Sequence, residues 1–575
     1  MNTKSSNDKE KSSPYPLCLR FFAEIKALGV KEVIISPGSR STPLVLSAHA
    51  VGLEIRVVLD ERVASFYALG NAKSSGVPCI LICTSGTSSA NYLPAVVEAN
   101  HAGVPMIVCS ADRPPEQRQW GAGQTIDQVN LYGRNVRWGF DLPVATEVDE
   151  MFARSIAVRA WERAQVGQGP VHLNWPFREP LEPDGELSKP IATLKPFEIS
   201  NAVPSGRKRL EELAVQYERG LVVVGPNDFT NVELQQILFF SQFAGWPILA
   251  DPASQMRGGS MGQQHNVITT AEILCGSEHF TQSLKGVEAI VHTGLTPTSK
   301  EYRKWAAKNP PLKKILVSPG TDWSDPSNQL VEAHQGNLFC GFEDSEKQIR
   351  PDSDWLMKWR EADSKATSII SESMSAAKSG ISAIQAVRLG VPDGATIVLS
   401  NSMTIRNAEL AFMNKGNAYR TISNRGANGI DGVVSTSVGV AFGADGKTLA
   451  VVGDVAATHD IGGFFAADRL QTDLTIVIFD NKGGGIFSSL PVAQSVDKEI
   501  FNKFYTTSPN LALPEILAAA GITVEIPTSL DGLTAAVTSG IAGEGLTVIW
   551  YRTDSTTTVE NINQIRENFD IEFVG

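Results

Sequence analysis

The sequence predicts an α/β protein with three doubly wound domains, each built on a parallel sheet. At 575 residues the chain is long enough for about three domains of roughly 100–200 residues each. Short apolar runs alternate with amphipathic stretches, the pattern of strands joined by helical crossovers. Polar, proline-containing linkers interrupt the alternation at Glu182–Gly206 and Glu343–Asp354. We therefore expect a disordered polar leader and three domains, at 1–13, 14–185, 200–350 and 365–575.

Composition narrows the class of protein. Hydrophobic residues make up 42% of the chain, beside 49 Gly and 31 Pro, as in a globular enzyme. The formal net charge of −12 argues against a nucleic-acid partner. No apolar run reaches the ~18 residues of a membrane span, and the polar N-terminus lacks the apolar core of a secretory signal. The six cysteines form no C-x-x-C pair and the eight histidines no zinc motif, so we expect a cytoplasmic enzyme with free thiols.

Five strand-like runs mark the first domain, at Glu32–Ile35, Ile55–Leu59, Cys79–Cys83, Met106–Cys109 and Val171–Leu173. Ligands of such sheets bind where the strands end, so the loops after these runs are candidates for function. The first loop, SPGSRSTP, has a glycine for a tight turn, and Arg40 beside it is a candidate anion ligand. A plain surface arginine explains the same residue.

The second run ends at Asp60-Glu61, directly before the helical stretch ERVASFYALG. Helix capping explains both acids, with Asp60 at the N-cap and Glu61 in the first turn. A catalytic carboxylate at Glu61 is the alternative. The later runs of this domain are followed by polar loops as well, TSGTSSAN at 84–91 and ADRPPE at 111–116, with GAGQ at 121–124.

The middle domain repeats the alternation, with runs at Leu221–Val224, Ile248–Ala250, Ala289–His292 and Lys314–Val317. No G-x-G-x-x-G motif follows any of these runs, so the pattern of a dinucleotide site is missing. We expect this domain to be structural.

The last domain has five such runs, at Thr396–Leu399, Tyr419–Ile422, Leu449–Val452, Leu474–Phe479 and Val548–Tyr551. Between the first two, Ser402 and Arg406 lie four positions apart and would share one face of a helix that starts there. The segment SNRGANGIDG, at 423–432, follows the second run.

The stretch Gly453–Leu490 holds a candidate metal site. Asp454 ends the third run and Asn481 follows the fourth, 27 positions apart (481 − 454), about one strand–helix–strand crossover. Both side chains would then project from the carboxyl ends of strands. Two hard oxygen ligands, followed by the flexible Gly483-Gly484-Gly485, suit a magnesium ion that also holds a phosphate. An ordinary βαβ unit with turn-forming Asp, Asn and Gly explains the same pattern.

This stretch resembles the cofactor motif of thiamine-diphosphate enzymes, with Val455 and Asp480 where that family usually has Gly and Asn. The segments SPGSRSTPL, DERVASFYALG, TSGTSSAN and DRPPE, in this order, closely resemble one branch of it, the 2-succinyl-5-enolpyruvyl-6-hydroxy-3-cyclohexene-1-carboxylate synthases of menaquinone or phylloquinone synthesis. SNRGANGIDG and the ending GPVHLNWPFREPL match as well. The resemblance covers nearly the whole chain and implies the thiamine-diphosphate-enzyme architecture.

The resemblance implies a role for each domain: pyrimidine-binding for the first, structural for the second, diphosphate- and magnesium-binding for the third. It makes Glu61 the catalytic carboxylate, set against the cofactor's pyrimidine ring to promote formation of the ylid. The implied cofactors are thiamine diphosphate and Mg²⁺, with Mn²⁺ as a substitute. The cofactor would be bound by Glu61, Thr84, Ile430, Asp454, Asn481 and Ile486. The metal ligands would be Asp454, Asn481 and the carbonyl of Gly483.

The implied reaction is decarboxylation of 2-oxoglutarate and conjugate addition of the remaining carbanion to isochorismate. Both substrates carry carboxylates, which call for arginines. The residues implied to bind them are Ser39, Arg40, Arg113, Gln124, Lys300, Ser402, Arg406, Arg425, Ile486, Phe487 and Leu490. Gly123 and Gly485 stand where some relatives carry polar amide side chains, which puts a hydrogen bond in question at each place.

The family also implies a homodimer or homotetramer, with the Glu-bearing domain of one chain facing the magnesium-binding domain of another. Two other functions stay open. A different thiamine-diphosphate decarboxylase or carboligase would keep Glu61, Asp454 and Asn481 without needing Arg40, Arg113, Arg406 and Arg425. A non-catalytic metabolite-binding protein would keep the fold, and its function would not depend on Glu61.

Overall fold

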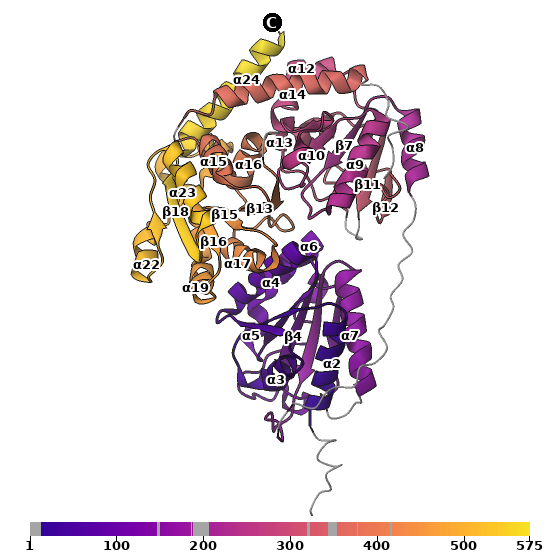
Figure 1. Cartoon of the computed structure of the whole chain (residues 1–575), viewed down its shortest axis with the longest axis vertical. Coiled ribbons are helices and arrows are strands. Elements are labelled where there is room, and N and C mark those ends of the chain that lie inside the picture. The colour runs from indigo at the N-terminus through magenta and orange to yellow at the C-terminus, as the bar shows by residue number, and fades with distance from the viewer. Residues whose placement is uncertain are drawn as a thin grey trace, which may run out of the picture. The chain divides into compact units, whose positions relative to one another are not determined.

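A computed structural model describes residues 13–145, 150–185, 187, 206–318, 323–342, 353–376, 378–413 and 417–574 of the chain. Its framework is three six-stranded parallel sheets, each packed between helices (Figure 1). This confirms the predicted architecture of three doubly wound α/β domains. The predicted leader, apart from Ser13, and most of both linkers lie outside the described residues, and the domain boundaries stay a prediction.

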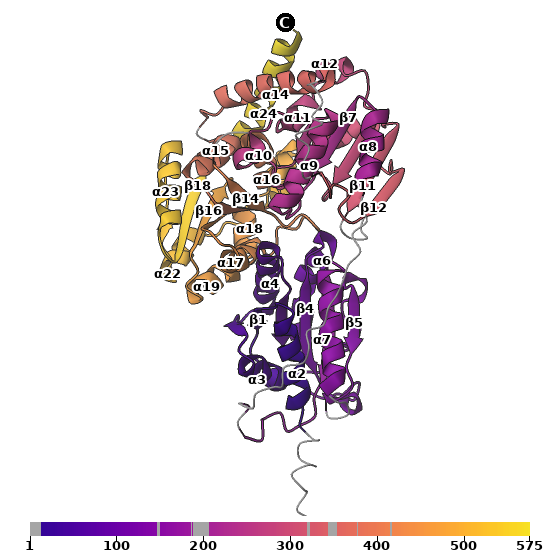
Figure 2. The same cartoon turned by 45° about the vertical axis from the view of Figure 1, so that its right-hand side comes forward.

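Contacts along the chain divide it into two compact units. Unit 1 comprises Met1–Asn201, Asp431–Ala444 and Asp460–Leu470, and it contains the first sheet. Unit 2 comprises Ala202–Ile430, Asp445–His459 and Gln471–Gly575, and it contains the second and third sheets. In Figure 2 the first sheet is indigo to purple, the second magenta, and the third orange to yellow.

The first sheet has the strand order β2-β1-β3-β4-β6-β5. Its strands are β1 (Glu32–Ile35), β2 (Glu54–Val57), β3 (Cys79–Cys83), β4 (Met106–Asp112), β5 (Trp138–Asp141) and β6 (Pro170–Pro176). β1, β3, β4 and β6 are buried along their whole length, which is why they consist of almost continuous apolar residues.

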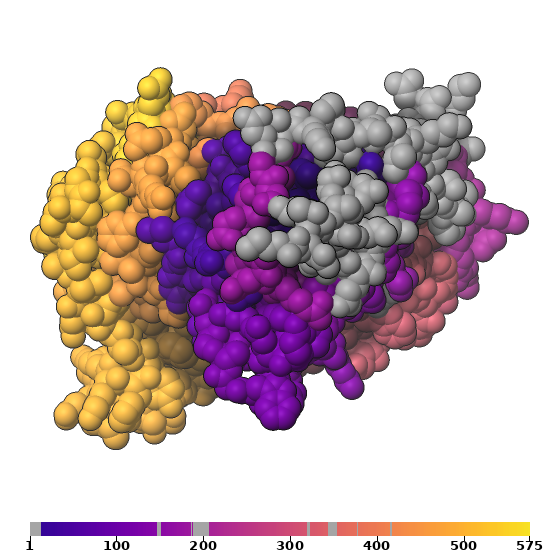
Figure 3. Space-filling view, turned by 90° about the horizontal axis from the view of Figure 1, so that it is seen from below, coloured from indigo at the N-terminus to yellow at the C-terminus, as the bar shows by residue number. Residues whose placement is uncertain are grey.

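Helices of the first domain form two layers. α2, α3 and α7 pack together, and α4 packs with α6 across the sheet (Figures 1 and 2). The helices are α2 (Tyr15–Ala27), α3 (Thr42–Ala50), α4 (Glu61–Ser75), α5 (Thr87–Asn91), α6 (Leu93–Ala102) and α7 (Glu150–Gln165). Seen in space-filling form, the indigo and purple atoms of this domain form one closely packed surface (Figure 3).

The third sheet repeats the topology of the first, with the order β14-β13-β15-β16-β18-β17. Its strands are β13 (Ala395–Leu399), β14 (Tyr419–Ile422), β15 (Thr448–Gly453), β16 (Leu474–Asp480), β17 (Val524–Glu525) and β18 (Leu546–Arg552). The longer helices of this part of the chain are α15 (Gly380–Gly390), α16 (Met403–Ala411), α22 (Leu513–Ala519) and α23 (Leu530–Ala542) in unit 2. α17 (Val433–Gly443) and α19 (Ile461–Arg469) lie between its strands in sequence but belong to unit 1. The strand order reverses between β13 and β15, and ligands of such sheets bind at this point.

The second sheet has the order β12-β11-β10-β7-β8-β9, with its reversal between β7 and β10. Its strands are β7 (Gly220–Val224), β8 (Ile248–Ala250), β9 (Val267–Ile268), β10 (Ala289–Thr293), β11 (Lys313–Ser318) and β12 (Glu332–Gln335). Its helices are α8 (Arg207–Gln216), α9 (Asn231–Ala244), α10 (Gly259–Gly262), α11 (Ala271–Leu274), α12 (Glu278–Ser283) and α13 (Lys300–Lys308).

Two long helices join the second and third sheets into one unit. α14 (Asp354–Glu372) packs on α24 (Ser555–Val574), and α24 also contacts α12 (Figure 1). A single apolar cluster accordingly runs from Leu221 in β7 to Phe569 in α24. All six cysteines are free, five of them buried, as expected. None of the described helices is long and apolar enough to cross a membrane.

Four strands were not predicted: β5, β9, β12 and β17. Each lies at the edge of its sheet. β5, β12 and β17 are only partly buried, and β9 has just two residues, so none of them produces the apolar run by which the central strands were found.

Candidate active site

The carboxyl edge of the third sheet contains a cavity of about 190 Å³. Its walls come from the loops after β13, β15 and β16 and from the start of α24, at the reversal of strand order. Seven of the predicted site residues line it: Ser402, Ile430, Asp454, Asn481, Gly483, Ile486 and Phe487.

Parallel pairing brings Asp454 and Asn481 together. β15 and β16 are neighbours in register, with Gly453 opposite Phe479, so the next residues of both strands leave the sheet side by side. Asp454 begins the short helix α18 (Asp454–His459), and its side chain is held by two backbone N–H groups. Val455 donates to Oδ1 at 2.9 Å and Gly483 to Oδ2 at 2.7 Å. Burial raises the pKa of the Asp454 carboxyl to about 7.

Three oxygen atoms lie close together here, one each from Asp454, Asn481 and the carbonyl of Gly483. In one orientation of the Asn481 amide, its Oδ1 lies 2.7 Å from the carbonyl oxygen of Gly483 and 3.1 Å from Oδ1 of Asp454, and its Nδ2 donates to Ser555 Oγ at 3.2 Å. In the reversed orientation, Nδ2 donates to the first two oxygens and Oδ1 accepts from Ser555. The reversed amide is favoured without a cation, because it leaves no oxygens facing one another.

The first orientation fits a bound cation. Magnesium takes oxygen ligands at about 2.0–2.1 Å in octahedral geometry, which places adjacent ligands about 2.8–3.0 Å apart. The separations of 2.7 and 3.1 Å bracket that spacing. The donor set of one carboxylate, one amide and one carbonyl is also typical of magnesium.

The glycine loop beside these oxygens is closely enclosed. Gly483 has φ +124, and a Cβ there would collide with the carbonyl of Thr506. The N–H of Gly484 donates to the same carbonyl at 2.6 Å. A Cβ on Gly485 would collide with the Asn481 amide and lie 2.5 Å from Ser555 Oγ. Backbone contacts therefore require glycine at 483 and 484, whereas at 485 a side chain would displace the Asn481 amide or the Ser555 hydroxyl.

Asp480 lies outside this oxygen cluster. Its Oδ1 accepts from the N–H of Lys482 at 3.1 Å, and its Oδ2 lies 3.7 Å from Nε of Arg552. The residue therefore stabilises the turn after β16, and an aspartate can replace the more usual asparagine there without removing a ligand.

A group of arginines lies near the loop after β13. Arg406 of α16 donates to the carbonyl of Ser402 at 2.5 Å, and Arg425 donates to Oδ1 of Asn401 at 2.7 Å. Burial, and then the nearby charges of Arg425 and Arg303, lower the pKa of Arg406. Like charges brought together in a partly buried place favour an anionic ligand. Arg303, in α13, was not predicted.

Ser402 has an unusual backbone. It precedes α16 with φ +64 and ψ −129, a conformation that non-glycine residues rarely adopt. Strain of this kind is concentrated at functional sites. Its position at the cavity supports the sequence prediction that Ser402 contacts a ligand.

In unit 1, Glu61 begins α4 and receives a hydrogen bond from Ser88. Oγ of Ser88 lies 2.5 Å from Oε1 of Glu61. Asp60 caps the helix, since its Oδ1 accepts from the N–H groups of Arg62 at 2.8 Å and Val63 at 3.3 Å. Capping is thus carried out by Asp60, and the Glu61 carboxylate is held by a side chain of the short helix α5, which follows β3.

Arg40 and Arg113 also lie in unit 1, in the loops after β1 and β4. Arg40 is buried and donates to the carbonyl of Phe177 at 3.1 Å and to the largely exposed carboxylate of Glu179 at 3.1 Å. Arg113 donates to Ser85 Oγ at 2.5 Å. Burial and the nearby Arg40 lower the pKa of Arg113. An anionic ligand would have to replace Glu179 to bind Arg40.

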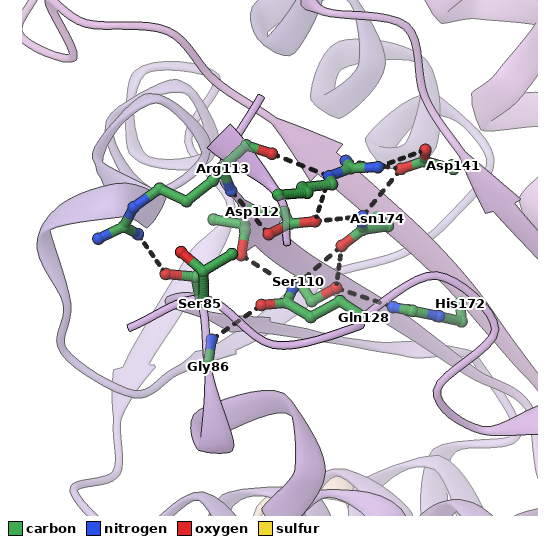
Figure 4. A network of polar contacts seen from close by, with 12 residues as sticks. Ser85, Gly86, Ser110, Asp112, Arg113, Gln128, Asp141, His172 and Asn174 are labelled. Carbon is green, nitrogen blue, oxygen red and sulfur yellow. Dashed lines mark hydrogen bonds and ion pairs between the residues drawn. The ribbon is translucent and has the colours of Figure 1, made fainter. Parts of the chain in front are cut away.

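A buried network holds the TSGTSSAN loop in place. Gln128 accepts from the N–H of Gly86 at 2.8 Å and donates to the carbonyl of Ala111 at 3.1 Å and to Asn174 Oδ1 at 3.0 Å (Figure 4). Asn174 donates in turn to Asp112 at 2.9 Å. The network therefore connects the loop after β3 and the segment that carries Gln128 to strands β4 and β6, at the carboxyl edge of the first sheet.

Five predicted site residues remain: Thr84, Gln124, Ser39, Lys300 and Leu490. Thr84 is buried, and Gly38 approaches it so closely that a side chain there would collide with it. Gln124 is exposed, with φ +55, and donates to the carbonyl of Ser85 at 3.0 Å. Ser39 is exposed, Lys300 is exposed at the start of α13, and Leu490 follows the 3-10 helix Gly485–Ser489. Of the residues predicted in unit 2, Lys300, Leu490, Arg406 and Arg425 are not among those that line its cavity.

Family models match all three parts of the chain. The N-terminal thiamine pyrophosphate (TPP) binding domain matches residues 20–131, the middle domain of thiamine pyrophosphate enzymes residues 195–398, and the C-terminal TPP binding domain residues 383–550. Curated relatives over 30% identical match more than nine-tenths of the chain. The chain belongs to the thiamine pyrophosphate enzyme family.

Three relatives in this family are named 2-succinyl-5-enolpyruvyl-6-hydroxy-3-cyclohexene-1-carboxylate synthase. The protein of Bacillus velezensis is 34% identical over 94% of this chain and 95% of its own length. Those of Chloroflexus aurantiacus and Listeria innocua are 36% identical, covering 92% and 93% of this chain and 92% and 94% of their own. Benzoylformate decarboxylase from Polynucleobacter necessarius, 15% identical, has the same fold with a TM-score of 0.69, covering 94% of this chain and 99% of its own.

The residues present fit the thiamine diphosphate of this family. Converging oxygens suit the cation, and glycines 483–485 leave room beside it that a Cβ would fill. Ile430, Ile486 and Phe487 supply an apolar wall in the same cavity. Asp454, Asn481 and Gly483 would hold the metal, and the loop that follows would face the diphosphate.

Sequence reasoning missed several members of this thiamine pyrophosphate enzyme's candidate site. Asn174 had a detectable signal, because with His172 it is one of two polar residues inside a fully buried strand. The rest lie in loops or at a helix start, far along the chain from their partners: Ser88, Gln128, Asn401 and Ser555.

Proposed function

We propose that this protein is a 2-succinyl-5-enolpyruvyl-6-hydroxy-3-cyclohexene-1-carboxylate synthase that depends on thiamine diphosphate. It would decarboxylate 2-oxoglutarate and add the remaining four-carbon unit to isochorismate, releasing carbon dioxide. The observation that carries this proposal is two pairs of neighbouring arginines: Arg40 with Arg113, after β1 and β4, and Arg406 of α16 with Arg425, which follows β14. Both substrates are polyanions, and a neutral acceptor would not need them.

The cofactor site rests on unit 2. Asp454, Asn481 and the carbonyl of Gly483 are assigned to Mg²⁺, which Mn²⁺ could replace, and the cation would hold the diphosphate. When bound, thiamine diphosphate supplies a carbon nucleophile for the keto group and accepts the electron pair that carbon dioxide leaves behind. Ile430 is assigned to the support of the cofactor's bend, and Ile486 and Phe487 to the apolar wall that excludes water.

Glu61 is assigned to the aminopyrimidine end of the cofactor, together with Thr84. The hydrogen bond from Ser88 fixes Oε1 of Glu61, so its other oxygen can be presented in one direction. A carboxylate held in this way can pass a proton to and from the ring nitrogen, which is how it would assist the deprotonation of the reactive carbon.

The substrate residues divide between the two units. Arg406, Arg425 and Ser402 are assigned to carboxylates of the substrates on the side of unit 2, with Lys300 and Leu490 at the margin. Ser39, Arg40, Arg113 and Gln124 are assigned to the side of unit 1. Each charge-assisted hydrogen bond of this kind contributes on the order of 1.5–3 kcal/mol to the free energy of binding.

The assembly is a homo-oligomer, a dimer or a tetramer, in which Glu61 of one chain faces the magnesium site of a second. A protein of this kind would act in the cytoplasm in menaquinone or phylloquinone synthesis. Dilution below the dissociation constant of the dimer should then abolish turnover.

The experiment that tests the function follows the absorbance of isochorismate. Purified protein with thiamine diphosphate, Mg²⁺, 2-oxoglutarate and isochorismate should consume isochorismate, and leaving out any other component should stop the loss. Glu61→Gln, which keeps the size of the side chain, should lower the rate by about 10²–10⁴-fold. Untouched isochorismate with consumption of another acceptor would refute the substrate assignment, and an unimpaired Glu61→Gln variant would refute the role of Glu61.

A further inference from the structure

Ser555 is the first residue of α24, and its hydroxyl faces the metal-ligand candidate Asn481. Oγ of Ser555 lies 3.2 Å from the Asn481 amide, across 74 positions of sequence. The residue lines the cavity together with Asn481 and Gly483. It is therefore close enough to hold the amide by a hydrogen bond without being a ligand itself.

The backbone around Ser555 is held from both sides. The N–H of Thr553 donates to the carbonyl of Asp480 at 2.9 Å, and the N–H of Asp554 donates to the carbonyl of Lys378 at 2.8 Å. Asp554 caps α24 by accepting from the N–H of Thr557 at 2.7 Å. Because these contacts fix the start of the helix, the Ser555 hydroxyl has a defined position.

The space for this hydroxyl exists because residue 485 is glycine. A Cβ on Gly485 would lie 2.5 Å from Ser555 Oγ and would collide with the amide of Asn481. A larger side chain at 485 could not fit beside Ser555 in this arrangement. The hydroxyl thus occupies the room that such a side chain would take.

A hydroxyl can serve both orientations of the amide, since it has one donor and two acceptor sites. With Oδ1 of Asn481 turned toward Asp454 and Gly483, Nδ2 donates to Ser555. With the amide reversed, Ser555 donates to Oδ1. Only the first orientation presents an oxygen to a cation, and an alanine at 555 would leave its Nδ2 without this acceptor.

We propose that Ser555 is a positioning residue for Asn481, and that Gly485 and Ser555 act as a pair in which the glycine leaves room for the hydroxyl beside the amide. This inference rests on the proposed cation site. Partners of metal ligands typically change metal affinity by about 10–100-fold when they are removed. Ser555 should therefore affect cation binding before any substrate is present.

The test measures Mn²⁺ binding by electron paramagnetic resonance, with the full-length protein and saturating thiamine diphosphate. Ser555→Ala should weaken Mn²⁺ binding about 10-fold or more, whereas Ser555→Thr, which keeps the hydroxyl, should stay closer to the original affinity. Gly485→Ala should also weaken binding, because its methyl group meets both Ser555 and Asn481. Thr556→Ala is the matched control, since Thr556 is the exposed next residue of the same helix and should leave the affinity unchanged.

Original affinity in Ser555→Ala would overturn the positioning role. If Ser555→Ala does not fold, Gly485→Ala is the deciding variant. Mn²⁺ binding by Gly485→Ala as tight as that of the unaltered protein would overturn the proposed pairing of Gly485 with Ser555. Failure of the unaltered protein to bind Mn²⁺ with thiamine diphosphate is a different result, because it would refute the cofactor site of the proposed function.

Discussion

Arg257 is a buried cation that joins the middle domain to α16. Its Nε donates to the carbonyl of Ala250 at 2.8 Å, and its two other nitrogens donate to the carbonyl and to Oε1 of Glu409, each at 2.8 Å. The side chains of Arg257 and Glu409 are 0% and 4% exposed, so solvent cannot replace either partner. Replacing Arg257 therefore removes the only cation paired with Glu409 in the described part of the chain.

We predict that Arg257→Met lowers the free energy of unfolding by about 3–5 kcal/mol at pH 7, the usual cost of breaking a buried ion pair from one side. Methionine fills much of the space but leaves the Glu409 carboxylate and the Ala250 carbonyl without their donor. The double variant Arg257→Met/Glu409→Gln should lose less, because a neutral amide needs no opposite charge.

The free energy of unfolding of Arg257→Met should depend on pH in a definite direction. Burial raises the pKa of the Glu409 carboxyl, although Arg257 opposes the shift, and removing Arg257 should raise the pKa further. A carboxyl with a raised pKa in the folded state stabilises that state below its unfolded pKa, and this stabilisation is lost as the pH rises through the folded value. Arg257→Met should therefore regain stability between pH 8 and pH 5, and the double variant should regain less.

Urea unfolding followed by tryptophan fluorescence measures both effects. Arg209→Met is a matched control, because Arg209 pairs with Glu332 at 2.6 Å but is about one-third exposed, and its loss should cost no more than about 1 kcal/mol. If Arg257→Met is destabilised no more than Arg209→Met, or has the same stability at pH 5 and pH 8, the reasoning about this buried pair is wrong.

Two further predictions concern the site. Ser88→Ala removes the hydrogen bond to Glu61 and should lower kcat about 10-fold or more. Thr87→Ala, at the exposed neighbouring residue, should leave kcat unchanged. Equal steady-state rates in the two variants would contradict the role of Ser88. Ser402→Gly should raise the melting temperature, because glycine relieves backbone strain of about 1–3 kcal/mol at φ +64. Ser402→Ala should not raise it. If Ser402→Gly melts at or below the temperature of Ser402→Ala, the backbone at this residue is not strained.

The central strands were predictable because burial on both faces requires apolar residues throughout. β1, β3, β8 and β14 match their predicted bounds, and the predicted runs in β15 and β16 end one residue before those strands do. Edge strands have one side open to solvent, so their residues are less constrained: β2 and β14 still produced a strand-like run, whereas β5, β12 and β17 did not and were missed. Burial therefore made the central strands predictable, and it left the edge strands predictable only in part.

Residues at the site were predictable where the fold places them at strand ends. Asp454 and Asn481 follow adjacent strands, so spacing alone brought them together. Ser555 meets Asn481 only because α24 returns to the cavity after β18, and Ser88 meets Glu61 because α5 packs on α4. No local pattern marks such partners, since their position depends on how distant parts of the chain pack.

The last helix connects the cavity with the middle domain. α24 starts at the cavity with Ser555, and near its other end Arg566 forms an ion pair with Glu272 at 2.8 Å and Asp570 accepts from Ser277. Lys365 of α14 donates to the carbonyl of Glu572 at 2.5 Å. A purification tag or a truncation at the C-terminus would therefore disturb contacts that anchor the helix bearing Ser555. Studies of cofactor retention should use a chain tagged at its N-terminus.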